Sequence, residues 1–77
     1  YNEADKQFDA EQLEGFIRQL PPMTSKVFNL FAIDGYPHTE ISKMLDISEG
    51  TSRWHLASAR KKLQEMIRNA MNASKIV

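Results

Sequence analysis

Apolar residues recur at helical spacing near the start of the chain. The stripe consists of Leu13, Phe16, Ile17 and Leu20, which is the spacing of one buried helix face. Asp9 is a candidate N-cap with Gln12 as its capping-box partner, and Phe8 and Leu13 occupy the two positions of a hydrophobic staple. Because proline fits a first helical turn but breaks an interior, Pro21-Pro22 is expected to end this helix and begin the next.

A second helix is predicted from about Pro22 to Asp34. Its expected inward face consists of Met23, Val27, Leu30 and Phe31, with Phe28 beside them. Gly35 can adopt the left-handed conformation that ends a helix, so it is the expected terminator. Tyr36-Pro37 is then a short connector.

The following residues have the pattern of a helix–turn–helix. A short helix is expected at about His38–Leu45 and a long one from Glu49 to about Asn72. Ser48 is a good N-cap for the long helix. Between the two helices, Ser42 is small where the helices cross, Asp46 tolerates left-handed turn geometry, and Ile47 fills the gap.

These patterns predict an all-α fold, a four-helix domain with a C-terminal helix–turn–helix and a long recognition helix. The domain spans residues 8–72, with a linker remnant or frayed end at residues 1–7 and a C-terminal tail at residues 73–77. A chain of 77 residues and 42% apolar composition fits one small globular domain. It starts at Tyr1 without Met or a signal-peptide pattern, so we expect it to be a piece of a longer protein.

The formal net charge of zero hides an asymmetry. Residues 1–50 hold nine acidic and four basic side chains, whereas residues 51–77 hold six basic and one acidic. A basic segment on an otherwise acidic domain is typical of a face that binds a polyanion. A solvated surface helix explains the charges equally well.

The long helix can be divided into faces at 100° per residue. The apolar line is Leu56, Ala59, Leu63, Met66, Ile67 and Ala70, and the opposite side carries Trp54, Ala57, Ser58, Lys61 and Glu65. Arg53 and Arg60 flank one edge, and His55 and Lys62 flank the other. Gly50 lies in the first turn, where either the close approach of a phosphate or backbone, or simple tolerance at a helix end, explains a glycine.

In a recognition helix the N-terminal outer face enters the major groove and flanking side chains contact phosphates. The candidate base readers are Arg53, Trp54, His55 and Ser58, and the candidate phosphate contacts are Thr39, Lys43, Thr51, Arg60, Lys61 and Lys62. Trp54 has an alternative role in packing against another domain. His55 has an alternative role as a partly buried residue bonded to a backbone carbonyl, and His38 is expected only to start its helix.

Nothing in the sequence indicates an enzyme. His38 and His55 are 17 residues apart and the chain has no cysteine, so no metal site with ligand spacing is present. The serines show no nucleophile arrangement and there is no Gly-rich phosphate loop. We therefore expect no catalytic residues, no metal and no cofactor. The longest nearly apolar run is too short to span a bilayer.

Five segments resemble a known family. They are Leu20-Pro21-Pro22, Val27-Phe28, Gly35 to Ile41, Leu45 to Thr51 and Ala59 to Leu63. Together they resemble the C-terminal region 4 of bacterial RNA polymerase sigma factors, and most closely those of the extracytoplasmic-function (ECF) group. The resemblance covers roughly residues 9–68.

The resemblance implies a cytoplasmic protein that binds double-stranded promoter DNA at the minus-35 element. It also implies docking on the β-subunit flap of core RNA polymerase and control by an anti-sigma factor. The chain departs from the family pattern at Ser52, where an aliphatic residue is common, and at Trp54, where a small one is usual. His55 and Ser58 stand where the family has bases, which implies a different promoter preference. Pro37 and Asp46 replace a frequent Ser and Gly.

Two other classes of protein remain open from the sequence. The DNA-binding output domain of LuxR-like response regulators has the same four-helix layout, although the Leu20-Pro21-Pro22 break and the long basic last helix favour a sigma factor. A helical protein-interaction module would use Trp54 and the apolar faces to hold a partner helix.

Overall fold

The computed structural model describes residues 10–75 and the side chains of residues 10–72. The elements are α1 (Ala10–Arg18), α2 (Pro22–Phe28), η2 (Asn29–Ile33, a π-helix), α3 (His38–Leu45) and α4 (Glu49–Lys75). Within these residues every regular element is a helix, so the predicted all-α fold is confirmed. The predicted cap at Asp9, the staple residue Phe8 and the linker at residues 1–7 lie outside the described residues.

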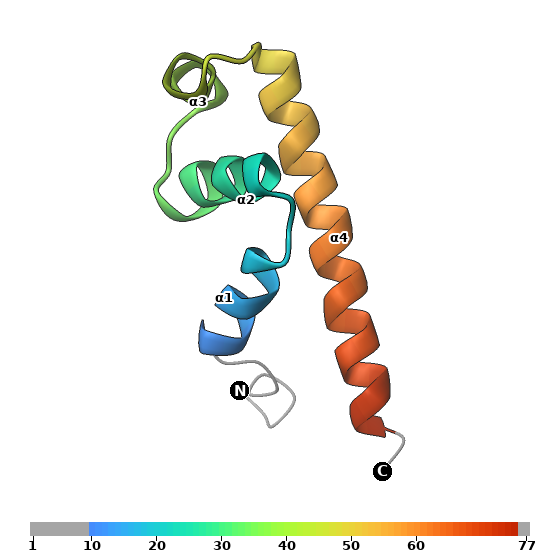
Figure 1. The fold of residues 1–77 in the computed structure, drawn as a ribbon. Helices are drawn as coiled ribbons and strands as arrows, with labels where there is room; N and C mark the ends of the chain where they lie inside the picture. The colour runs from blue at the N-terminus through green and yellow to red at the C-terminus, as the bar shows by residue number, and fades with distance from the viewer. Residues whose placement is uncertain (1–9, 76–77) are drawn as a thin grey trace.

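The long helix α4 forms the axis of the molecule, and the other three α-helices lie along it. Figure 1 shows α4 running the length of the molecule, with α1, α2 and α3 following one another along one side of it. The molecule measures 46 × 22 × 15 Å, and the 27 residues of α4 account for about 40 Å of that length at 1.5 Å per residue. The helix continues to Lys75, three residues past its predicted end at Asn72.

The prolines separate the first two helices as expected. The chain leaves α1 through two tight backbone hydrogen bonds, from Gln19 N to Phe16 O and from Leu20 N to Ile17 O. Pro21 is the N-cap of α2 and Pro22 is its first residue. Leu20 is buried beside Ile17, whereas Leu13 at the start of the predicted stripe is 40% exposed.

The predicted second helix consists of two parts. After α2 the backbone widens into η2, where Asp34 N bonds to Asn29 O five residues earlier. Gly35 follows with a φ of 83°, which confirms it as the left-handed terminator. Met23 was expected on the inward face, but it is 37% exposed, and Thr24 is buried in its place.

The helix–turn–helix has the predicted boundaries at its junction. Asp46 is the C-cap of α3 with φ 56° and ψ 50°, the left-handed geometry expected there. Ile47 packs against the buried cluster beneath the two helices, as predicted. The Thr51 amide donates a 3.0 Å hydrogen bond to Ser48 Oγ, which confirms Ser48 as the cap of α4.

The core has two clusters along α4. One joins α1 to the middle of α4 through Ile17, Leu20, Ala59 and Leu63. The other joins α2 and α3 to the start of α4 through Val27, Ile41 and Leu56. Phe28 packs against both clusters. The helix–turn–helix therefore has its own buried support, separate from that of α1.

Candidate nucleic-acid interface

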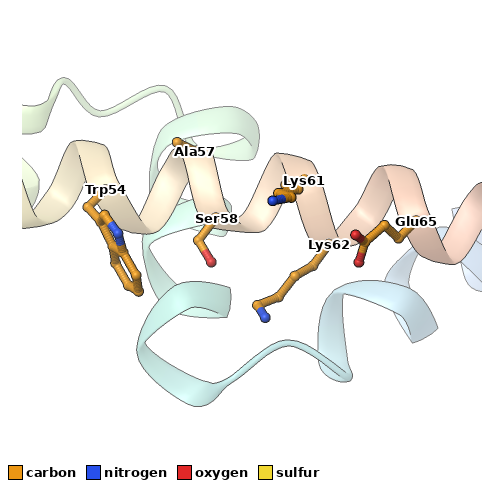
Figure 2. A pocket seen from close by; sticks show the side chains of 6 residues that line it. All are labelled: Trp54, Ala57, Ser58, Lys61, Lys62 and Glu65. Carbon is orange, nitrogen blue, oxygen red and sulfur yellow. The ribbon is translucent and has the colours of Figure 1, made fainter.

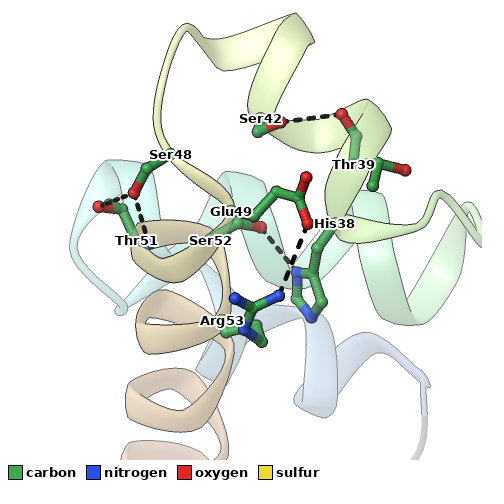
Figure 3. Close-up of polar contacts among 8 residues, drawn as sticks. All are labelled: His38, Thr39, Ser42, Ser48, Glu49, Thr51, Ser52 and Arg53. Atoms are coloured by element: carbon green, nitrogen blue, oxygen red, sulfur yellow. Dashed lines mark hydrogen bonds and ion pairs between the residues drawn. The ribbon is translucent and has the colours of Figure 1, made fainter.

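The start of α4 is held by a short hydrogen-bond network (Figure 3). Ser48 Oγ accepts from the Thr51 amide and donates to Thr51 Oγ1 at 2.8 Å. One turn further, the Arg53 guanidinium lies 3.7 Å from the Glu49 carboxylate, and both side chains are largely exposed. An exposed ion pair of this kind is weak, so Arg53 can leave Glu49 for a stronger acceptor at little cost.

A buried hydrogen bond joins α3 to the same turn. His38 Nδ1 lies 2.8 Å from Ser52 Oγ, and Ser52 is fully buried. The face of the His38 ring stacks on Phe31, with ring centroids 4.6 Å apart and an interplanar angle of 16°. His38 starts its helix, as predicted, and also fixes the distance between α3 and α4. Ser52 stands where the family that the sequence resembles commonly has an aliphatic residue, and here its hydroxyl is paired with His38.

A second histidine joins α4 to α2. His55 Nδ1 lies 2.9 Å from Thr24 Oγ1, and Thr24 is 2% exposed. The sequence allowed a partly buried His55 bonded to a backbone carbonyl, but the structure pairs it with a side-chain hydroxyl. The same ring meets Trp54 edge to face, with centroids 5.0 Å apart and an interplanar angle of 75°.

The outer face of α4 forms an open groove. It is lined by Trp54, Ala57, Ser58, Lys61, Lys62 and Glu65, all from α4 (Figure 2). Trp54 is 63% exposed, and Figure 2 shows Trp54, Ser58 and Lys62 projecting on one side of the helix. Two of the predicted base readers and two of the predicted phosphate contacts thus line one surface.

The predicted phosphate contacts differ in how they are engaged. Arg60, Lys61 and Lys62 are exposed, and among the described residues no acidic side chain forms an ion pair with any of them. Lys43 lies 3.9 Å from Glu40 in an exposed pair. Thr39 is exposed at the start of α3, and its carbonyl accepts a hydrogen bond from Ser42 Oγ.

Gly50 lies in the first turn of α4 and is exposed. A Cβ built there meets only Ser48 Oγ, at 3.9 Å, which is ordinary van der Waals contact. The fold itself therefore does not require a glycine at this position.

Thr24 was not among the functional residues predicted from the sequence. Its hydroxyl lies on a helix face that otherwise reads as apolar, three positions before Val27, and this is the one signal that marks it. Across residues 10–75 the structure holds no cluster of acidic or histidine side chains suited to a metal ion. Among the same residues no helix combines the length and apolar character needed to cross a bilayer.

A short helix, a left-handed turn and a capped long helix with a cationic outer face define a helix–turn–helix DNA-binding domain. Comparison with family models refines this class: residues 10–63 match sigma-70, region 4. The chain belongs to this sigma-factor family, whose members are non-enzymatic domains that bind promoter DNA and act with RNA polymerase. No curated protein and no solved structure showed significant similarity to the chain.

Proposed function

We propose that the chain binds the minus-35 promoter element as region 4 of an ECF-type sigma factor, in the bacterial cytoplasm. In this proposal the N-terminal half of α4 lies in the major groove of duplex DNA. Arg53, Trp54, His55 and Ser58 face base edges, and the phosphate contacts come from Thr39, Lys43, Thr51, Arg60, Lys61 and Lys62.

The observation that supports this function most directly is that basic side chains on α4 are exposed and form no ion pair among the described residues. Lys61 and Lys62 line the same groove as Trp54 and are exposed without an acidic partner among the described residues. A cationic side chain that is already solvated and unpaired loses no ion pair when it meets a phosphate. Arg60, on another side of the helix, is in the same state.

The direct test is a salt titration of binding to duplex DNA, measured by fluorescence anisotropy. With about four basic side chains in contact with phosphates, log K should fall against log salt with a slope of about −3.6. Sequence preference is then found by selecting bound duplexes from a randomised pool. Absence of binding to any duplex at low salt would overturn the proposal.

The proposed protein partner is the β-subunit flap of core RNA polymerase. Purified core polymerase should retain the chain, and polymerase lacking the flap should not. Equal retention by both polymerases contradicts the flap as the docking site. If neither polymerase retains the chain, the proposed interaction with RNA polymerase is wrong. The DNA-binding proposal then depends on the salt titration alone.

We further propose that an anti-sigma factor controls this domain by covering the cationic face of α4. This predicts competition, so a purified anti-sigma factor that binds the chain should release labelled duplex DNA from it. A ternary complex of chain, duplex and anti-sigma factor would contradict shared use of that face.

A further inference from the structure

The indole of Trp54 is an apolar surface in a cationic setting. It is 63% exposed, and it contacts the ring of the neighbouring His55. Ala57, one turn along and also exposed, and Lys61, two turns along, line the same groove. The exposed part of the indole contributes little to burial of the core, so its value to the protein lies in what it contacts outside the domain.

The indole is oriented by a residue inside the domain. Thr24, on α2 and 2% exposed, shares a 2.9 Å hydrogen bond with His55 Nδ1. The His55 ring in turn meets the indole at 75°, the edge-to-face geometry that aromatic pairs favour. A buried hydroxyl therefore fixes one ring, and that ring limits the positions open to the other.

From this arrangement we propose that Trp54 recognises thymine in duplex DNA by contacting its C5-methyl group, and that Thr24 is a positioning residue for this contact. The inference rests on the proposed function and deepens it. The indole has one N–H donor and no acceptor, and the rest of its surface is apolar. Among the groups that base pairs present in the major groove, the thymine methyl is the apolar one.

The neighbouring side chains fit the same target. Ala57, exposed one turn after Trp54, lines the same groove, and Trp54 and Ala57 are its two apolar lining residues. The hydroxyl of Ser58, which donates and accepts, suits the adjacent polar edge of a base pair. Lys61 and Lys62 follow Ser58 along α4, and Figure 2 shows the Lys62 side chain extending back toward the end of the groove where Ser58 and Trp54 lie.

The test compares thymine with deoxyuridine, which lacks only the methyl group. Duplexes are selected from a randomised pool with the whole chain, and each selected thymine is then replaced by deoxyuridine in turn. At one or two positions the replacement should weaken binding about fourfold per methyl group, the change expected for burial of one carbon. With Trp54→Ala the same replacements should have no effect, whereas Trp54→Phe should keep part of it.

The role of Thr24 is tested with a matched pair of substitutions. Thr24→Val removes the hydroxyl at nearly constant shape, and Thr24→Ser keeps it. Thr24→Val should lower the discrimination between thymine and deoxyuridine while the slope of log K against log salt stays as in the unaltered chain. Thr24→Ser should restore the discrimination. Loss of discrimination in both variants, with native helical content by circular dichroism, contradicts positioning through the hydroxyl.

Other outcomes separate this inference from the proposed function. If the chain binds duplexes with a steep salt slope but no thymine-to-deoxyuridine replacement affects binding, methyl recognition is wrong and the proposed function stands. If Trp54→Ala leaves all duplex binding intact but abolishes retention by core polymerase, Trp54 contacts a protein and not DNA. If no duplex is bound at low salt, both proposals fail.

Discussion

The His38 ring nitrogen Nδ1 and the Ser52 hydroxyl lie 2.8 Å apart, across the interface between the two helices of the helix–turn–helix. Ser52 is fully buried, so its hydroxyl has no water to replace this partner. Removing the His38 ring leaves the buried Ser52 hydroxyl without a hydrogen-bond partner, which lowers the free energy of unfolding by about 1–3 kcal/mol.

This hydrogen bond predicts coupled effects on stability. Ser52→Ala should lower the free energy of unfolding by about 1 kcal/mol, and His38→Ala by more because it also removes the stack on Phe31. The double variant should be less destabilised than the sum of the two by roughly 1 kcal/mol, since the pair is lost only once. Urea unfolding followed by circular dichroism measures all three. Strictly additive effects would show that the two groups do not interact in solution.

The turn of the helix–turn–helix allows a prediction at Asp46. Its backbone is left-handed, a conformation that costs a residue with a Cβ roughly 1–2 kcal/mol unless a short polar side chain compensates. Asp46→Ala should therefore lower the free energy of unfolding by about 1 kcal/mol, whereas Asp46→Gly should preserve or raise it. The same urea titration applies. Equal destabilisation by both substitutions would mean that the Asp46 side chain, and not its backbone, supports the turn.

A substitution at Gly50 can distinguish an effect on folding from an effect on DNA binding. Because a Cβ at this position meets only ordinary contact, Gly50→Ala should stabilise the domain, by up to about 1 kcal/mol from helix propensity. If a phosphate or backbone approaches the first turn of α4, the same substitution should weaken duplex binding. The prediction is thus a higher unfolding midpoint together with a lower affinity for duplex DNA. A higher midpoint with unchanged affinity would leave simple tolerance as the reason for the glycine.

Charge reversal on α4 tests the phosphate contacts. Arg60→Glu combined with Lys61→Glu should weaken binding to every duplex sequence. The slope of log K against log salt should become shallower, from about −3.6 to about −1.8, because each lost phosphate contact reduces its magnitude by about 0.9. Arg18→Glu combined with Lys26→Glu is the control matched in charge, since both residues are exposed and lie outside α4. The exposed ion pair of Arg18 with Glu14 contributes little to stability. A comparable loss with the control would mean that net charge, and not position on α4, governs binding.

Local signals in the sequence were sufficient for the elements around the helix–turn–helix. The boundaries of α3, the left-handed turn at Asp46 and the cap at Ser48 depend on a few neighbouring residues, so their pattern is visible in the chain. The buried positions Leu56, Ala59 and Leu63 followed in the same way from helical spacing.

Features that depend on how helices cross were not predictable in this way. The bond between Thr24 and His55 joins residues 31 positions apart, and which hydroxyl meets which ring depends on the angle between α2 and α4. The apolar spacing of η2 does not differ from that of an α-helix, so the sequence predicted one continuous helix from Pro22 to Asp34. Exposure of Met23 likewise follows from the direction in which α2 crosses α4.

The division of the core at Phe28 gives the molecule two parts that respond unequally to disturbance. Damage to the packing of α1 can reach the helix–turn–helix through Phe28, through the link to α2 and through the backbone of α4. Amide protons of α1 should consequently exchange with solvent well before those of the Val27–Ile41–Leu56 cluster. A partner that pulled α1 away should therefore disturb the Val27–Ile41–Leu56 cluster less than the cluster that contains Ile17.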